Sequence, residues 1–331
     1  MKITMIPGDG IGKEIAKATM EVIDKTGADI QWEVVNAGAE TYEETDKIIP
    51  QDVYDSIERN KVAIKGPTAT PIGSGFRSAN VHLRKHYNLH ANIRPVDSIG
   101  KTPSLYENID LVLFRENTED LYAGIEEKIS DDEMHSIKII TRQASDKIIR
   151  DAFNYAKDHN KSKVSVVTKA NIMKLTDGLF LEVARNVKED FPGVDLEEVL
   201  VDNMAMQLVM NPCQFGVIVT ENLYGDILSD IMAGLIGGLG LVPGANIGDD
   251  YAIFEAVHGS APDIAGKGLA NPTALILSAC MMLDYLGMDK EAKMVRDAME
   301  KTLSNKDNFT KDLGGDKSTE EFTQIILAHM A

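Results

Sequence analysis

Short apolar runs alternate with longer segments of helical periodicity along the whole chain. Strand-like runs cover residues 2–7, 30–37, 61–66, 109–114, 163–168, 215–220 and 251–257. Apolar residues at helical spacing predict helices at 12–25, 52–59, 144–159 and 176–191. This alternation predicts an α/β fold with a mostly parallel sheet.

Three features of the sequence depart from this alternation of strands and helices. Residues 121–128 and 135–142 have no long helix between them, which predicts a protruding antiparallel arm. Residues 231–248 are apolar but rich in glycine, which favours a buried loop over a membrane span. The "PGDGIG" segment at 7–12 lacks the G-x-G-x-x-G spacing of a dinucleotide fold, so we interpret it as a tight strand-to-helix turn.

Length, net charge and cysteine content limit the number of domains, the kinds of partner and the cellular location that we expect. With 331 residues the chain is long enough for about two domains. Its formal net charge of −18 argues against nucleic acid or an anionic membrane as a partner. No signal peptide is visible. Cys213 and Cys280 stand far apart in apolar stretches, so we interpret both as reduced core residues and expect a cytoplasmic location.

Polar segments follow five of the predicted strands. They are "GPTATP", "RENTED", "TKAN", "TENLYGD" and "HGSAPD". Because sites in open α/β sheets gather at the carboxyl ends of strands, these segments predict a cleft.

Within this acidic chain, residues 77–95 are unusually basic. A helix predicted to start near Ser78 would put Ser78 and Asn80 at a terminus that favours anions, with Arg84 on the same face as Asn80. Arg94 and Arg115 lie on extended segments nearby in sequence. Any one of these arginines could simply pair with a surface acid. Together, they predict a pocket for a polycarboxylate, which guanidinium groups bind bidentately.

Carboxylates and proton-transfer groups supply the remaining chemistry. Asp226 and Asp230 are spaced i, i+4 on a predicted, largely buried helix, which favours a hard divalent metal over a solvated acidic face. Asp202 is a possible third ligand. Lys169 and Tyr122 are candidates for proton transfer, although a lysine in that position can also be an ordinary rim residue.

Taken together, these motifs resemble the β-decarboxylating dehydrogenases, which include isocitrate, homoisocitrate, 3-isopropylmalate and tartrate dehydrogenases. The resemblance rests on "KGPTATPIGSGFRSANVHLRK", "ANIRP", "RENTEDLYAG", "TKANIMK", "NLYGDILSD" and "HGSAPDIAGK", in that order. It implies a two-domain, non-Rossmann fold and a homodimer. It also implies Mg²⁺ or Mn²⁺, and hydride transfer to a nicotinamide followed by loss of CO₂.

The resemblance assigns roles to the basic segment. It implies that Arg84, Arg94 and Arg115 clamp a malate-type substrate. Ser78 and Asn80 resemble the donors for the distal carboxylate of isocitrate. The implied substrate is therefore a small tricarboxylate.

It also implies a site shared between subunits. Asp226 and Asp230 would hold the metal, with Asp202 and the proton acceptor Lys169 supplied by the other subunit. Tyr122 would reprotonate the enolate carbon.

The cofactor implied is NAD. Thr70, His258 and Asn271 resemble cofactor contacts. Asp263 and Ile264 stand where NADP-using relatives commonly carry Lys and Tyr, and an aspartate would repel a 2′-phosphate. Asp263 could instead be a surface acid.

The resemblance also implies the domain plan and the reaction. The large, cofactor-binding domain would comprise 1–97 and 248–331. The small domain would comprise 98–247, with its arm near 120–142. NAD-dependent isocitrate dehydrogenase is the first expectation and homoisocitrate dehydrogenase the alternative. A non-catalytic regulatory subunit is an alternative of a different class.

Overall fold

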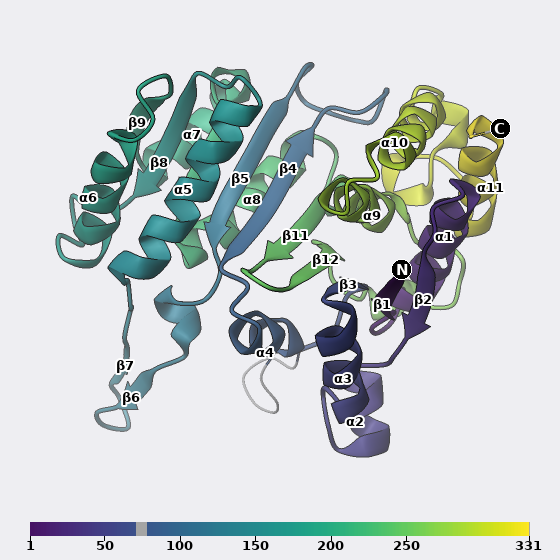
Figure 1. The fold of residues 1–331 in the computed structure, drawn as a ribbon, viewed down its shortest axis with the longest axis horizontal. Coiled ribbons are helices and arrows are strands. Elements are labelled where there is room, and N and C mark those ends of the chain that lie inside the picture. The colour runs from purple at the N-terminus through teal and green to yellow at the C-terminus, as the bar shows by residue number, and fades with distance from the viewer. Residues whose placement is uncertain (71–77, 331) are drawn as a thin grey trace.

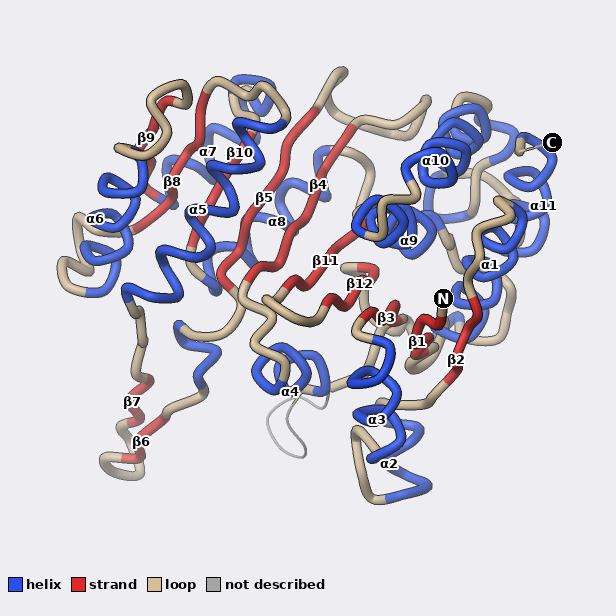
Figure 2. The backbone as a smooth tube through the Cα atoms, viewed as in Figure 1, coloured by secondary structure: helices blue, strands red, loops and turns tan. Residues whose placement is uncertain are grey.

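The computed structural model describes residues 1–70 and 78–330. Within them, one ten-stranded sheet runs through the whole molecule (Figures 1 and 2). In spatial order its strands are β2 (Gln31–Val34), β1 (Lys2–Ile6), β3 (Val62–Lys65), β12 (Ala252–Ala256), β11 (Pro243–Ile247), β4 (Ala91–Asp97), β5 (Asp110–Glu116), β10 (Val217–Thr220), β8 (Lys163–Thr168) and β9 (Asp195–Leu200). The sheet is mostly parallel, as predicted.

A central antiparallel strip divides the sheet in two. β11 pairs antiparallel with both β12 and β4, and β4 pairs antiparallel with β5. The strands β3 and β12 therefore run opposite to β5, β10 and β8, and their carboxyl ends lie at the opposite edge. The polar segments therefore do not meet in a cleft at one common edge of the sheet, contrary to what the sequence had predicted. Side chains instead meet on one face of the central strip.

Helices cover both faces of the sheet. The α-helices are α1 (Gly12–Lys25), α2 (Ala39–Thr45), α3 (Gln51–Asn60), α4 (Ala79–His86), α5 (Arg142–Asp158), α6 (Thr176–Lys188), α7 (Val201–Met210), α8 (Asn222–Leu235), α9 (Thr273–Tyr285), α10 (Asp289–Leu303) and α11 (Thr319–His329). On one face, α3 and α4 pack at the β3 end and α7 and α8 at the β10 end. On the other, α9 packs on β11 and β12, whereas α5 packs on β5 and β10. Each face therefore has a gap between helices over the central strip.

The predicted arm is present but shorter than its sequence segments. β6 (Glu126–Lys128) and β7 (Met134–Ser136) pair antiparallel and project away from the sheet (Figure 1). The predicted domain boundaries fall at the ends of β4 and β11 and remain a prediction. No helix in residues 1–70 and 78–330 is long and apolar enough to cross a membrane.

One cysteine prediction is wrong. Cys280 is buried in α9, but Cys213 is exposed, in a short 3-10 turn (Pro212–Gln214) that precedes β10. Leu208 and Phe215, before and after the turn, are buried, but Val209 and Met210 are exposed like Cys213, because the end of α7 and the turn lie at the surface.

The "PGDGIG" turn packs too closely for any larger side chain. Gly8 and Gly10 both have positive φ, and a Cβ on either would lie 2.1 Å from a backbone oxygen, of Pro67 and Ser260 respectively. Between them, the buried Asp9 carboxylate accepts three backbone N–H bonds of 2.7 to 3.0 Å, from Ala39, Glu40 and Ala69. This carboxylate therefore joins three loops at the end of β1.

Asp9→Ala would leave those three donors without their acceptor. We expect it to lower the free energy of unfolding by about 2 to 4 kcal/mol, because each buried unpaired donor costs about 1–3 kcal/mol and water recovers part of the loss. The measurement is equilibrium denaturation by urea. Glu43→Ala, on the exposed face of α2, is the matched control and should change stability by less than about 0.5 kcal/mol. Equal effects of the two variants would contradict this role for Asp9.

Candidate active site

A polar pocket of about 330 Å³ occupies the gap between α4 and α8. Its floor is one face of the central strip, the face to which the side chains of Asn92, Arg94 and Arg115 project. The predicted residues that line it are Thr70, Ser78, Asn80, Arg84, Arg94, Arg115, Tyr122, Asp226 and His258. Residues separated by up to 188 positions thus meet at one place. Residues 71–77, which include Arg77 at the start of the basic stretch, lie outside the described residues.

Asp226 is the central acceptor of the pocket. It forms an ion pair with Arg115, lies 3.8 Å from Arg94 and accepts a 2.6 Å hydrogen bond from the Tyr122 hydroxyl. Burial acts to raise the pKa of Asp226, but Arg115, Tyr122 and Arg94 outweigh it and hold that pKa below its ordinary value. The carboxylate is therefore ionised and shared by two arginines.

The arginines are themselves tightly held. Arg115 donates to the Asn222 side chain at 2.7 and 3.0 Å, and Arg94 donates to Asn92 at 2.7 Å and to Ser229. Burial, followed by the neighbouring Arg115, lowers the pKa of Arg94 to about 9, so Arg94 is still protonated at neutral pH. Fixed guanidinium groups in a buried pocket are suited to carboxylates.

Gly225 allows α8 to lie this close to the sheet. A Cβ at this position would come within 2.5 Å of the Arg115 side chain. The helix that carries Asp226 can therefore approach Arg115 only because residue 225 has no side chain.

The third arginine, Arg84, belongs to a buried charge group with Glu255 and Lys65. Sequence analysis assigned no role to these last two residues. Glu255 on β12 forms ion pairs of 2.9 Å with Arg84 and 3.0 Å with Lys65, and all three side chains are buried. Burial acts to raise the pKa of Glu255, but Lys65 and Arg84 bring it well below its usual range. Asn246 also donates to this carboxylate at 2.8 Å. The sequence did contain a signal for this pair, because Lys65 and Glu255 are the single charged residues of the otherwise apolar strands "VAIK" and "AIFEA".

Helix α4 begins where the sequence predicted. Ser78 is its N-cap residue and forms no side-chain capping bond, so its hydroxyl is not used by the helix. The Asn80 side chain accepts a 3.1 Å bond from Thr68. Both residues line the same pocket as Arg84, as the i, i+4 spacing of Asn80 and Arg84 predicted.

His258 borders the pocket on the β12 side. Its Nε2 is buried without a partner among the described residues, and burial lowers the pKa of the ring, which favours the neutral imidazole. A buried nitrogen that faces a pocket suits a hydrogen-bonding ligand. Of the other predicted cofactor residues, Asp263 is exposed and Ile264 half-buried in a short 3-10 turn, and Asn271 donates to Asp312 at 3.0 Å. These three do not line the pocket.

The predicted proton acceptor and third metal ligand lie apart from the pocket. Lys169 pairs with Asp202 at 2.5 Å, and neither residue lines it. Asp230, one turn after Asp226 on α8, is exposed and does not line it either. Within residues 1–70 and 78–330, no three His, Cys, Asp or Glu side chains gather as a metal-binding group.

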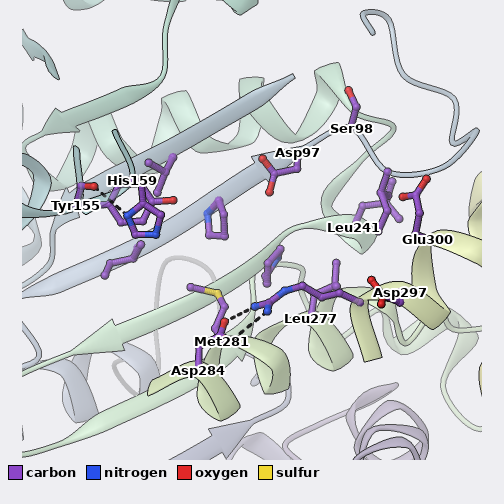
Figure 3. A pocket seen from close by; sticks show the side chains of 16 residues that line it. Asp97, Ser98, Tyr155, His159, Leu241, Leu277, Met281, Asp284, Asp297 and Glu300 are labelled. Carbon is purple, nitrogen blue, oxygen red and sulfur yellow. Dashed lines mark hydrogen bonds and ion pairs between the residues drawn. The ribbon is translucent and has the colours of Figure 1, made fainter. Parts of the chain in front are cut away.

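A second pocket, of about 580 Å³, lies on the opposite face of the sheet (Figure 3). Tyr155 on α5 and His159 just after that helix border it on one side, and Leu277 and Met281 on α9 border it on the other. None of the predicted site residues contributes to it. The predicted site residues therefore do not gather at this second pocket.

The family model for isocitrate/isopropylmalate dehydrogenase matches residues 2–326. The chain is 50% identical to the Arabidopsis thaliana mitochondrial isocitrate dehydrogenase [NAD] catalytic subunit 5, covering 99% of this chain and 88% of that protein. It is also 50% identical to a mitochondrial isocitrate dehydrogenase [NAD] regulatory subunit from Dictyostelium discoideum, covering 98% and 91%.

Among solved structures, isocitrate dehydrogenase from Methylococcus capsulatus superposes with a TM-score of 0.96 at 47% identity, covering 99% of both chains. The resemblance recognised from the motifs is therefore confirmed over the length of the chain. The protein belongs to the isocitrate/isopropylmalate dehydrogenase family.

Proposed function

We propose that this protein oxidises and decarboxylates isocitrate to 2-oxoglutarate and CO₂ while reducing NAD, with a divalent metal ion. The observation that carries the proposal is the group of three buried arginines, Arg84, Arg94 and Arg115, in one pocket with Ser78 and Asn80. The arginines supply positive charge for the substrate carboxylates. We assign the distal carboxylate to the two polar residues at the start of α4, because they line the same pocket.

The proton-transfer roles rest on the residues' chemistry. In the proposed reaction Lys169, in its neutral form, would accept the hydroxyl proton, and Tyr122 would protonate the enolate carbon left by loss of CO₂. NAD, when bound, would supply the hydride acceptor. Burial, together with the hydrogen bond to Asp226, raises the pKa of Tyr122, so its hydroxyl keeps its proton at neutral pH. A protonated phenol beside the substrate pocket fits the role of acid.

The carboxylates fit a hard divalent cation. Asp226 and Asp230 lie one turn apart on α8 and offer oxygen ligands, and the proposed third ligand is Asp202 of the partner subunit. When bound, Mg²⁺ or Mn²⁺ would stabilise the negative charge that develops on the substrate oxygens. Within residues 1–70 and 78–330, Asp226 and Asp230 do not gather with a third His, Cys, Asp or Glu, so the proposed site takes its third ligand from the partner subunit.

Exposed apolar side chains support a homodimer. They lie on the arm, in the loop after Lys169, and on α7, the helix that carries Asp202. The most exposed are Ile129, Met134, Ile172, Leu175, Val209 and Met210. Large exposed apolar side chains such as these are typical of interaction surfaces.

Two alternatives have specific support. Homoisocitrate differs from isocitrate by one methylene, and a pocket discriminates a methylene by only about 1–3 kcal/mol. A regulatory role has support because one close relative bears that name. Against that role, this chain has Tyr122, Lys169, Asp202, Asp226 and Asp230. For location, we propose the cytoplasm.

A steady-state panel tests the proposal. With NAD and Mg²⁺, kcat/KM for isocitrate should exceed that for isopropylmalate and tartrate by at least about a hundredfold, because Ser78 and Asn80 face a carboxylate rather than an alkyl group. Ser78→Glu should damage isocitrate turnover far more than isopropylmalate turnover. Higher kcat/KM for homoisocitrate would favour the first alternative. No turnover of any of these substrates by the purified homo-oligomer would favour the regulatory role.

NAD is expected over NADP by about a hundredfold in kcat/KM, because Asp263 would repel the 2′-phosphate and accept hydrogen bonds from ribose hydroxyls. Asp263→Lys combined with Ile264→Tyr replaces repulsion with attraction, so it should lower kcat/KM for NAD and raise it for NADP. Lys290→Met, exposed on the first turn of α10, is the control and should leave the ratio within about threefold. A wild-type ratio at or below one would show that position 263 does not select the cofactor.

A further inference from the structure

Lys138 forms a buried charge cluster outside the substrate pocket. It follows the arm strand β7, and its ammonium lies 2.6 Å from Asp177, 2.5 Å from Glu221 and 3.9 Å from Asp120. These three carboxylates are fully or almost fully buried. The ammonium also stands over the Tyr224 ring, 4.5 Å from its centre. Three acids therefore converge on one lysine.

The cluster is connected to Tyr122 through Asp120. Asp120 belongs to the same short 3-10 helix as Tyr122 and accepts a 2.7 Å bond from the Leu223 backbone at the start of α8. Asp120 also has a positive φ of 69°, which is unusual for an aspartate and is held by these contacts. The position of the Tyr122 turn against α8 thus depends on Asp120.

The cluster is also connected to Lys169, through Asp177. The Asp177 carboxylate that pairs with Lys138 also accepts a 2.6 Å bond from the backbone N–H of Lys169 and a 3.2 Å bond from the Tyr224 hydroxyl. Asp177 is on the first turn of α6, so it ties the Lys169 loop to both α6 and α8. A single lysine therefore lies between the two segments that carry the proton-transfer candidates.

Lys138 is the cation that makes this arrangement possible. Burial alone would lower its pKa, but the carboxylates raise it above the ordinary value, so Lys138 stays charged. Burial raises the pKa of Glu221 to about 8 even with the lysine beside it. Replacing Lys138 by a neutral residue would leave three close acids without a counterion, and such a group separates or takes up protons.

We propose that Lys138 is a positioning residue with two targets: it holds Tyr122 for its own subunit's active site, and it holds Lys169 for the active site of the partner. This rests on the proposed function, in which Lys169 serves the other subunit. If so, one buried cluster per chain connects the two active sites of the dimer.

The test uses heterodimers with one competent site. Arg94→Ala and Lys169→Met homodimers should both be inactive. After subunit exchange, their heterodimer has a single intact site, which takes Tyr122 and Arg94 from the Lys169→Met chain and Lys169 from the Arg94→Ala chain. Recovery of activity, with exchange verified by native mass spectrometry, establishes this parent.

Lys138→Met is then added to one chain at a time. In the Lys169→Met chain it perturbs only the Tyr122 side of the competent site, and in the Arg94→Ala chain only the Lys169 side. We expect each heterodimer to lose at least about tenfold in kcat, while KM for isocitrate changes less than about threefold, because small displacements of reacting groups slow the reaction without removing binding contacts.

A loss in only one of the two heterodimers, or in neither, would overturn the proposal. An inactive parent despite demonstrated exchange would instead show that the site is not shared, and the proposed connection between sites would fail with it. Lys147→Met, which removes a partly exposed lysine paired with Asp249, is the matched control and should change neither heterodimer.

Two further variants guard against misfolding. Lys138→Arg keeps the charge and should restore part of the lost kcat. Asp177→Asn keeps the side-chain shape but weakens the bond to the Lys169 backbone. It should therefore reduce kcat more in the Arg94→Ala chain than in the Lys169→Met chain. Equal losses in the two chains would overturn the assignment of Asp177 to the Lys169 side.

Discussion

Four cations on one face of the sheet must be neutralised in a place that water scarcely reaches. Lys65, Arg84, Arg94 and Arg115 are all buried. Glu255 forms ion pairs with Lys65 and Arg84, and Asp226 forms ion pairs with Arg94 and Arg115. Two carboxylates against four cations leave an excess of positive charge, and an anionic substrate is the natural complement of that excess. The remote net charge of −18 does not alter this, because screened surface charges act weakly at such distances.

The two carboxylates differ in how firmly they are held. Glu255 is bound on several sides by Lys65, Arg84 and Asn246 and belongs to the sheet. Asp226 is on a helix at the edge of the pocket, and its contacts are with the very groups proposed to act on substrate. We therefore propose that Asp226 is exchangeable: substrate carboxylates would take its place on the arginines, and its own oxygens would become free for the cation. Binding of substrate and of cation would then favour each other.

The sequence predicted what depends on local periodicity and spacing. The helix at 12–25 has those bounds in the structure, Ser78 is at the start of α4, and Asn80 and Arg84 line one pocket. Long-range pairing was not predictable. Lys65 and Glu255 are 190 positions apart, and only the pairing of β3 with β12 joins them. The reversal at β11 and β4, and the exposure of Cys213, likewise depend on tertiary packing.

Calorimetric titration of isocitrate, with excess EDTA or with saturating Mg²⁺, tests the exchange of Asp226 most directly. The account predicts that Mg²⁺ tightens binding to the wild-type protein by at least about tenfold, or roughly 1.4 kcal/mol. In Asp226→Asn, isocitrate should bind more tightly than to wild type in EDTA, since the competing carboxylate has gone, and Mg²⁺ should add little. Wild-type affinity that is unchanged by Mg²⁺, together with weaker binding of isocitrate to Asp226→Asn in EDTA, would contradict it.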